Sequence, residues 1–543
     1  MESLCIGSRI SVTGDSATVK YIGTVPPTKG EWLGVEWDDP TRGRHDGTKD
    51  GVAYFKCRHK TSGSFIRATK ANFGVSICDA ITDRYTLPTE SGDSHMNDMY
   101  LGNIKIMKKI ETVGMDQVQK QFGKLNQLKQ IILRDQIISS AGTVGQLATL
   151  TPSLVELNLS KNLISSWDTV CDIVKQLPCL KVLNLSENIM QVTDKALSQP
   201  EVFANIDTMV LNKCSLSWEE LLTCTTMWPQ VTELHIEANN MTHLSPPGDK
   251  LNHVKLLHLS GNPLNSWHEV QQLSQLPMLS CLLIKECELS DLFIKPGDFK
   301  QLKELFLDRN KYESVHDLNP LNNLPEFIEL HFRKNPALNQ DRYDAIHDII
   351  VAKIKRLQRL DRLSVTQQSR FTAEMDYLRK YGVEWRESGG HQDPERNQPS
   401  QEFIENHPRY MELIAEHGAP DDKQFMKMSS ALKGNLLELI IEAPVKPDFK
   451  PVTKKLPKSM SIGSLKLLIQ KLTKIEIRNQ RLVYISKENP NLIVTLHRDR
   501  ETLDDVSIEP GDVIRVMKPK KGLNYIDTAE HDKTMYRMIY GDK

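Results

Sequence analysis

The residues best suited to chemistry lie in a short loop bounded by two glycines, Gly43 and Gly47. Glycine adopts backbone conformations that a Cβ forbids, so such a loop can bring its amide groups close to a ligand. Between the glycines stand a permanent cation, Arg44, a switchable hydrogen-bond donor, His45, and an acid, Asp46. This combination predicts a site for the carboxylates of an acidic chain end, in which the Arg44 guanidinium forms a bidentate pair with one carboxylate.

Aromatic and basic residues on both sides of the loop strengthen this prediction. We expect Trp32 and Phe65 to form an apolar floor for a terminal aromatic side chain. Residues 42–70 contain eight Lys or Arg against two Asp, in a chain whose net charge is −1, and this excess attracts acidic partners. The alternative is a solvated basic patch without a ligand. The predicted tail-binding residues are Trp32, Gly43, Arg44, His45, Asp46, Gly47, Phe65 and Arg67.

Residues 14–73, with a few residues before them, resemble the CAP-Gly domain, a small glycine-rich antiparallel β domain. The stretches that carry the resemblance are 7–9, 17–19, 32–38, 43–47, 51–57 and 63–67. Members of this family bind acidic C-termini that end in Glu-Glu-Tyr or Glu-Glu-Phe, as on α-tubulin, so the resemblance implies the same class of ligand. Most members have Gly-Lys-Asn-Asp-Gly in the loop. Here Arg44 keeps the charge, and His45 makes the interaction pH-dependent.

Length and composition predict a soluble chain of two to four domains. The 543 residues are 39% hydrophobic and 26% charged, and the pI near 7.0 argues against a dedicated nucleic-acid binder. No apolar run is long enough for a membrane span, and the first residues do not resemble a signal peptide. Nine cysteines without a C-x-x-C pair favour a reducing, cytoplasmic location.

From residue 128 to about residue 338, the pattern L-x-x-L-x-L recurs about every 23 to 26 residues, a spacing typical of leucine-rich repeats. One repeat cannot bury its own leucines, so neighbouring repeats must stack into a solenoid. Serine–tryptophan pairs at 166–167, 217–218 and 266–267 predict N-capped helices with buried tryptophans on the convex side. The repeats are 128–133, 154–162, 180–188, 206–214, 231–239, 254–262, 279–287, 302–310 and 327–335.

The segment that follows the repeats has a helical period of apolar residues over 344–363, which predicts one helix that caps the solenoid. A localisation signal formed by its basic residues is the alternative. Residues 387–433 predict a linker with short helices near 403–404 and 410–414. Strands at 436–441, 481–485 and 508–516 around a helix at 465–472 resemble the ubiquitin-like β-grasp fold. No Gly-Gly ends this part, so we expect docking and not conjugation.

The predicted fold class is therefore multidomain, with a small antiparallel β domain, an α/β leucine-rich-repeat solenoid with a C-terminal helical cap, and a β-grasp domain. The predicted boundaries are 1–86 for the CAP-Gly domain, 87–121 for a linker, 122–343 for the repeats, 344–386 for their cap, 387–433 for a second linker, 434–518 for the ubiquitin-like domain and 519–543 for a tail.

This order of domains resembles the E-type tubulin-folding cofactors. The resemblance implies a cytoskeleton-associated chaperone that captures α-tubulin and acts with cofactors B, C and D and β-tubulin to assemble or dissociate the heterodimer. It implies no enzyme, and the sequence has no phosphate-binding loop, nucleophile elbow or H-E-x-x-H motif. We expect no catalytic residue, cofactor, metal, nucleic acid or membrane partner. The alternatives are a microtubule-associated adaptor and an adaptor that docks on the proteasome.

Overall fold

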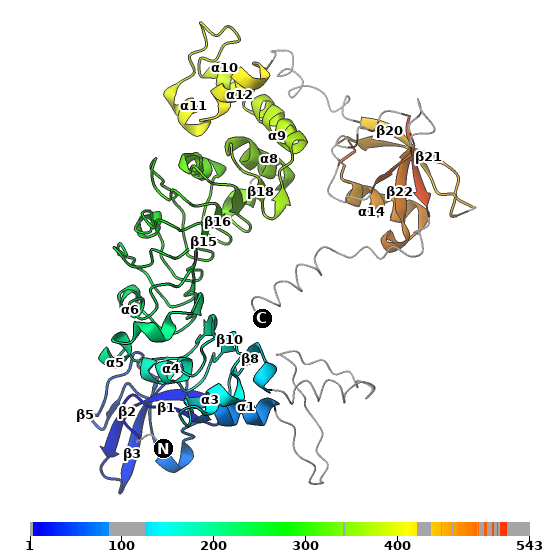
Figure 1. Cartoon of the computed structure of the whole chain (residues 1–543). Coiled ribbons are helices and arrows are strands. Elements are labelled where there is room, and N and C mark those ends of the chain that lie inside the picture. The colour runs from blue at the N-terminus through cyan, green and yellow to red at the C-terminus, as the bar shows by residue number, and fades with distance from the viewer. Residues whose placement is uncertain are drawn as a thin grey trace. The chain divides into compact units, whose positions relative to one another are not determined.

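The computed structural model describes residues 4–85, 125–339, 343–420, 436–446, 448–458, 460–485, 487, 493–496, 502–503, 506, 508 and 511–517. The predicted linker 87–121, the tail 519–543 and residues 421–433 lie outside the described residues. The described residues form a β domain, a repeat solenoid with a helical end, and a β-grasp domain, as the sequence predicted (Figure 1).

The β domain is an antiparallel sheet in the order β1-β2-β3-β6. One face of the sheet buries a small core that includes Ile10, Val19 and Val35. Because side chains alternate along a strand, Trp32 and Gly34 point to the opposite face. The strands are β1 (Arg9–Val12), β2 (Asp15–Thr24), β3 (Glu31–Trp37) and β6 (Gly63–Ile66), with a short hairpin of β4 (Thr48–Lys49) and β5 (Val52–Ala53) beside them.

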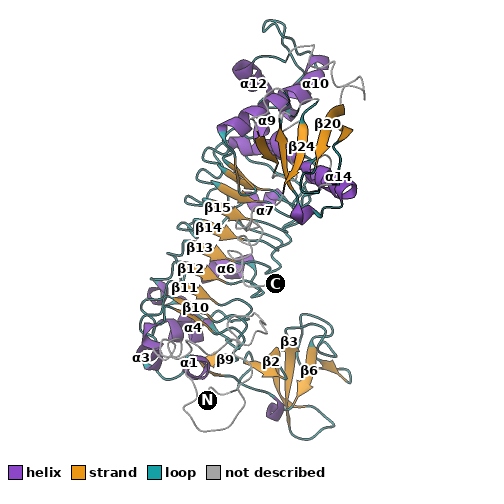
Figure 2. Cartoon of the chain, turned by 90° about the vertical axis from the view of Figure 1, so that its right-hand side faces the viewer, coloured by secondary structure: helices purple, strands orange, loops and turns teal. Residues whose placement is uncertain are grey.

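The repeats stack their short strands into one 11-stranded sheet, parallel throughout except at its last pair (Figure 2). The leucines of successive strands lie in register, for example Leu234 beside Leu257, so each repeat buries its apolar side against the next. The strands are β8 (Gln130–Ile132), β10 (Glu156–Asn158), β11 (Val182–Asn184), β12 (Thr208–Val210), β13 (Glu233–His235), β14 (Leu256–His258), β15 (Cys281–Leu283), β16 (Glu304–Phe306), β17 (Glu329–His331), β18 (Arg359–Leu360) and β19 (Leu363–Ser364).

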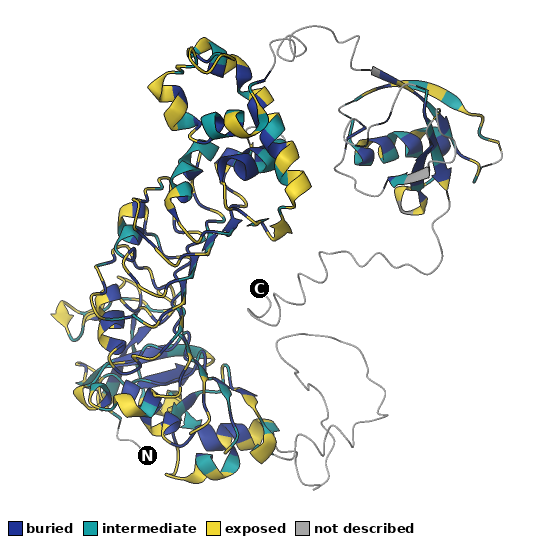
Figure 3. Ribbon diagram, turned by 45° about the horizontal axis from the view of Figure 1, so that its top comes forward, coloured by how far each residue is buried: buried dark blue, intermediate teal, exposed yellow. Residues whose placement is uncertain are grey.

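Short helices cover the other side of the leucine core, and Figure 3 shows this core as a continuous buried interior. Trp167, Trp218 and Trp267 each begin a helix and are at most 1% exposed, and the serine before each of them accepts a backbone N–H. The predicted caps and buried tryptophans are thus confirmed. The helices are α3 (Gln146–Leu150), α4 (Trp167–Val174), α5 (Asp194–Leu197), α6 (Trp218–Cys224) and α7 (Trp267–Gln271).

Buried asparagines at the end of the repeat motif connect one repeat to the next. Asn262 is 0% exposed, and its amide donates to the carbonyls of Ile236 (3.0 Å) and Leu259 (2.7 Å). Its Oδ1 accepts the N–H groups of Asn239 (2.9 Å) and Met241 (3.1 Å). One side chain therefore satisfies four backbone groups that cannot reach water.

The solenoid begins earlier than the first predicted repeat. Strand β7 (Val75–Ser76) pairs with β9 (Ile138–Ser140), and helix α1 (Ile77–Tyr85) follows β7 directly. Ile77 and Ile81 of this helix are 0% exposed and belong to the leucine core. Helix α1 therefore covers the first end of the repeats, as a terminal cap must.

At the other end, the predicted helix over 344–363 is wrong in its second half. Helix α8 (Tyr343–Lys353) ends ten residues earlier, and Leu360 lies in β18, beside Leu330 of β17. The reason is that Leu357 and Leu360 repeat the L-x-x-L start of the repeat motif, a spacing of three that a helix shares. The segment therefore adds one more strand to the repeat sheet before the chain turns into helices.

The helices after β19 are α9 (Gln367–Lys380), α10 (Gly382–Glu387), α11 (Gln401–Asn406) and α12 (Tyr410–His417). They share a second, smaller core with α8, which includes Tyr377, Trp385, Phe403 and Tyr410. Both short helices predicted in the segment 387–433 are present, and they pack in this core.

Buried Lys353 joins this helical end to the last repeats. It is 1% exposed, and its Nζ lies 2.5 Å from Asn406 O, 3.0 Å from Asn319 Oδ1 and 3.2 Å from His316 Nδ1. Burial lowers the pKa of Lys353 to about 7, although the carboxylate of Glu384 opposes this shift.

The β-grasp domain has a five-stranded sheet in the order β21-β20-β24-β22-β23, with β20 and β24 parallel. Helix α14 (Ile462–Thr473) is capped by Ser461, and its residues Leu465 and Ile469 belong to the domain core. The strands are β20 (Leu436–Glu442), β21 (Val452–Pro457), β22 (Arg481–Ile485), β23 (Ile493–Leu496) and β24 (Val513–Met517).

We call the hydrogen bonds that buried asparagines form between successive repeats the asparagine ladder. This ladder predicts that different substitutions at position 262 lower the free energy of unfolding by different amounts. The variant Asn262→Ala should lower the free energy of unfolding by about 3 kcal/mol, because four buried backbone groups lose their partner. The variant Asn262→Cys should lose less, since Cys287 occupies the same place in the next repeat and its thiol lies 3.5 Å from the carbonyl of Leu259. Urea denaturation followed by tryptophan fluorescence measures the difference, and equal losses in the two variants would contradict the ladder.

Lys353 predicts a pH dependence of stability. Its pKa is about 7 in the folded chain, against an ordinary lysine value of 10.5, so between these values the unfolded chain binds more protons. The free energy of unfolding should therefore rise with pH in this window, and the gain is lost as pH falls towards 7. Lys353→Met should flatten that rise between pH 7 and pH 9 in thermal unfolding. Lys355→Met, at an exposed neighbour, is the control and should keep the slope of the parent chain.

Candidate carboxylate-binding site

Backbone hydrogen bonds attach the loop 43–47 to strand β6 and to the segment after β5. The Arg44 N–H donates to Gly63 O at 2.8 Å, and the Gly63 N–H donates back to His45 O at 2.7 Å. The Cys57 N–H donates to Asp46 O at 3.1 Å. The loop is therefore held on both sides, and its side chains project from a fixed backbone.

The two predicted glycines are required by the close packing of this loop. Gly47 has a φ of +103°, and a Cβ built on it would lie 2.0 Å from Phe55 O. A Cβ on Gly43 would lie 2.5 Å from the carbonyl carbon of Ser62. Any other residue would move the loop away from its neighbours, because real Cβ atoms do not approach backbone atoms so closely.

His45 stabilises the turn from inside. Its Nδ1 accepts the N–H of Gly47 at 3.0 Å, so the neutral ring carries its proton on Nε2. Burial lowers the pKa of His45, while the charge of Asp46 opposes this shift. The imidazole is therefore neutral at physiological pH, and its Nε2–H is a hydrogen-bond donor.

An aromatic cluster lies against the loop, on the face of the sheet away from the core. It consists of Tyr21, His45, Tyr54, Phe55 and Phe65, which we call the aromatic floor. The ring of Phe65 is at its centre, with centroid distances of 5.1 Å to His45, 5.3 Å to Tyr54 and 5.5 Å to Phe55. Tyr21 lies 6.4 Å from Phe65. The contacts of Phe65 with Tyr21, Tyr54 and Phe55 are edge-to-face, and contacts of this kind stabilise an apolar surface.

Trp32 lies on the same face of the sheet as the aromatic floor, but its recorded contacts are with Arg67 and Thr28. The ring of Trp32 lies under the Arg67 guanidinium, 3.9 Å from its carbon to the ring centroid. Arg67 also donates to the carbonyls of Lys29 (2.7 Å) and Glu31 (2.8 Å). Of the predicted site residues, Phe65 thus lies with the loop, whereas Trp32 and Arg67 form a pair that fixes the turn before β3.

Two side chains of the loop have different roles. The Asp46 carboxylate accepts the N–H of Thr48 at 3.0 Å, and its hydrogen bonds to Thr48 lower its pKa. It therefore shapes the turn. The Arg44 side chain is exposed and makes no ion pair or hydrogen bond within the described part of the chain. By contrast, Arg58 is paired with Glu36 (3.4 Å).

Sequence reasoning missed three members of the aromatic floor, Tyr21, Tyr54 and Phe55. A signal was present, because Tyr54 and Phe55 are adjacent aromatic residues in the segment that follows the loop. No pattern in the sequence shows the bend that brings this segment over β3. Gly34 permits that approach, since a Cβ on Gly34 would lie 2.4 Å from the Phe55 ring.

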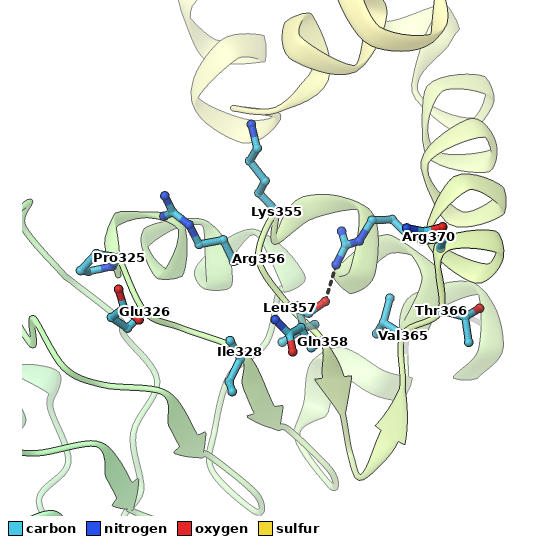
Figure 4. Close-up of a pocket in the computed structure, with 11 residues that line it drawn as sticks. Pro325, Glu326, Ile328, Lys355, Arg356, Leu357, Gln358, Val365, Thr366 and Arg370 are labelled. Atoms are coloured by element: carbon cyan, nitrogen blue, oxygen red, sulfur yellow. Dashed lines mark hydrogen bonds between the residues drawn. The ribbon is translucent and has the colours of Figure 1, made fainter.

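A pocket of about 400 Å³ lies at the other end of the repeats, between the loop after α8 and the start of α9 (Figure 4). Its basic residues are already engaged. Arg370 donates to the carbonyls of Val351 (3.0 Å), Ile354 (3.3 Å) and Leu357, so its charge caps the end of α8. Lys355 is paired with Glu412. The pocket therefore offers weaker recognition of an anion than the loop 43–47 does.

Comparison with known families agrees with this architecture. The family model of the CAP-Gly domain matches residues 6–71, and that of the ubiquitin-like domain matches residues 438–521. None of the helices in the described ranges combines the length and hydropathy of a membrane-spanning helix. The fold and the site thus define a protein with an N-terminal CAP-Gly domain, a leucine-rich-repeat solenoid and a C-terminal ubiquitin-like domain.

Curated relatives extend over nearly the whole chain. Tubulin-specific chaperone E of Bos taurus is 38% identical over 522 residues, covering 94% of this chain and 98% of the relative. Tubulin-folding cofactor E of Arabidopsis thaliana is 30% identical over 537 residues, covering 95% and 98%. The chain belongs to the tubulin-specific chaperone E family. A solved ubiquitin-like domain of mouse tubulin-specific chaperone e is 30% identical, covers 18% of this chain and 99% of that domain, and has a TM-score of 0.16.

The bond from Gly47 to His45 predicts a pH-dependent loop. Protonation of Nδ1 removes the acceptor, so the turn should loosen as pH falls below the ordinary histidine range, and the lowered pKa delays this loss. Asparagine can accept from the backbone two residues on in the same way, so His45→Asn should keep the turn at both pH values.

Hydrogen–deuterium exchange of the segment 43–57 at pH 7.5 and pH 5.0 measures this effect. Relative to His45→Asn at each pH, the parent chain should be equally protected at pH 7.5 and less protected at pH 5.0. His45→Ala should be less protected at both. Equal protection of all three proteins would show that Nδ1 does not hold the turn.

Proposed function

We propose that this chain is a tubulin-folding cofactor whose CAP-Gly domain binds the acidic C-terminal tail of α-tubulin. The observation that carries the proposal is the exposed side chain of Arg44, next in sequence to His45 of the aromatic floor, on a loop that backbone hydrogen bonds fix to β6. The names of the relatives support the tubulin-folding role, and the residues of the loop support an acidic chain end as the ligand.

In the proposed complex, Arg44 and the Nε2–H of His45 bind the terminal carboxylates, and the aromatic floor receives the last side chain of the tail. Arg44 can form two parallel bonds to one carboxylate. The surrounding Lys and Arg residues, including Lys49 and Lys60, attract the acidic tail before contact, so association should weaken at high salt. Trp32 and Arg67 would fix the turn before β3.

We also propose binding roles for the repeats and for the ubiquitin-like domain. The solenoid would contact the folded body of α-tubulin, and linkage to the tail site would raise the effective concentration of each contact for the other. The ubiquitin-like domain would serve as a docking module, and the chain would act together with cofactors B, C and D and β-tubulin. A microtubule-associated or proteasome-linked adaptor would use the same tail recognition.

The proposal predicts that binding depends on the end of the tail. We expect an α-tubulin tail peptide to bind the full chain at least tenfold more tightly than the same peptide without its last residue, by isothermal titration calorimetry. Arg44→Glu should abolish binding. Lys60→Glu makes the same change of charge at an exposed residue outside the loop and should weaken binding only modestly, in a salt-dependent way.

Equal affinity for the two peptides would exclude recognition of the chain end. If Arg44→Glu and Lys60→Glu lower the affinity for the peptide equally, Arg44 contributes only general electrostatic attraction and does not bind the carboxylate specifically. Co-sedimentation with microtubules separates the proposed role from the adaptor role, because a folding cofactor should bind soluble tubulin in preference to polymer.

A further inference from the structure

Three potential metal ligands meet on the solvent-facing side of the repeat sheet, far along the chain from the tail site. They are His235 at the end of β13, Glu237 just after it, and His258 at the end of β14. The Nδ1 atoms of His235 and His258 are 3.3 Å apart, and His258 Nδ1 lies 3.1 Å from Glu237 Oε1. The three donor atoms all lie within 4.8 Å of one another.

The repeat architecture brings these side chains together. Strands β13 and β14 are parallel, and His235 is the register partner of His258. Leu234 and Ile236 are 0% exposed in the leucine core, so the alternate residues His235 and Glu237 lie on the opposite face. The two histidines are 23 residues apart, one repeat, and so form no contiguous motif. This is why the sequence predicted no metal site.

We propose that His235, Glu237 and His258 form a binding site for a transition-metal ion of the zinc type. Zinc binds histidine nitrogen at about 2.0–2.1 Å and carboxylate oxygen at about 2.0–2.2 Å in tetrahedral geometry, which places neighbouring ligand atoms about 3.3 Å apart. The spacings of 3.3 Å and 3.1 Å match this value. A proton on His258 Nδ1 can point at only one of its two neighbours, whereas an ion between them binds all three.

Outer hydrogen bonds fix the orientation of the ligands. His258 Nε2 lies 2.9 Å from Ser260 Oγ, which accepts the N–H of Lys285 at 3.0 Å. If Nε2 carries the ring proton and donates it to Ser260, the Nδ1 lone pair points into the cluster. The Glu237 carboxylate accepts from Asn212 Nδ2 at 3.0 Å. Such partners orient metal ligands and usually contribute tenfold or more to affinity.

The site is closed on one side and open on the other. His258 is 2% exposed, whereas the Glu237 side chain is 28% exposed. Three protein ligands would leave the fourth tetrahedral position towards solvent, where a water or a side chain of a bound protein can enter.

Two other clusters of acids and histidines are less suitable. In the first, Asp308 and Asp361 already accept the backbone N–H groups of Arg333 and Phe332, each at 2.9 Å. In the second, Glu374 is bound by Arg409 at 3.1 Å. Binding in these clusters would compete with an arginine or with backbone N–H groups, whereas the two nitrogen ligands of the proposed site face each other at 3.3 Å and Glu237 Oε1 accepts from the neutral amide of Asn212.

Titration of the metal-free full chain with Co²⁺ and then Zn²⁺ tests the proposal. Because Cys5 and Cys179 are exposed and free, all proteins should carry Cys5→Ser and Cys179→Ser. We expect one equivalent of Co²⁺, with the visible absorption of a tetrahedral site and no thiolate band, and displacement by Zn²⁺. Zinc should also raise the midpoint of thermal unfolding, since it binds only the folded chain.

His235→Ala and Glu237→Gln should each weaken binding at least tenfold and abolish the shift of the midpoint. Both residues are partly exposed, so these variants should fold, which circular dichroism checks. The control is His243→Ala, whose side chain is 83% exposed outside the cluster and whose binding should be unchanged. Failure of the parent chain to bind one equivalent, or equal binding by His235→Ala, would overturn the proposal.

Discussion

The proposed tail site depends on how closely the backbone of the loop 43–47 approaches its neighbours. There is no space for a Cβ at Gly47, where the carbonyl oxygen of Phe55 would lie 2.0 Å away, or at Gly34, where the Phe55 ring lies. These contacts bring the segment after β5 under the loop and place Phe55 beside Phe65. Without them, Arg44 and His45 would still be polar loop residues, but no apolar surface would lie next to them.

A second constraint governs the repeats, namely that buried backbone groups must find partners where the strands end. Asn262 satisfies four such groups, and the buried thiol of Cys287 lies near the corresponding carbonyls in the next repeat. The ladder keeps the strands in register, and register decides which side chains meet on the solvent-facing side. The convergence of His235 and His258 is a direct result, because residues one repeat apart become neighbours.

Much of the fold could be predicted from the sequence, since its signals are local and periodic. The leucine spacing predicts the repeat strands from β8 to β17, and the serine before Trp218 predicts a helix start, which the structure confirms with a capping box. The cap helix over 344–363 was wrong because the spacing of Leu357 and Leu360 suits both a helix and a repeat strand. Only packing against Leu330 decides between them.

The loop residues of the candidate site could be predicted from the sequence, but most residues of the aromatic floor could not. Glycines around Arg44 and His45 are visible in the sequence, whereas the place of Phe55 depends on a fold of the chain that no local pattern encodes. For the same reason Trp32 was grouped with Phe65, although the structure pairs it with Arg67. The acceptor role of His45 Nδ1 also required coordinates, because the residue type alone suggests only a donor.

The central claim is that the loop and the aromatic floor hold the very end of an acidic tail. The most direct measurement is photo-crosslinking of full-length α-tubulin, with a reactive group on its last residue, to this chain, followed by mass spectrometry. The account predicts crosslinks to the loop 43–47 and to the segment that contains Tyr54 and Phe55. Crosslinks that fall on the repeat strands, with none on the loop or the floor, would contradict it.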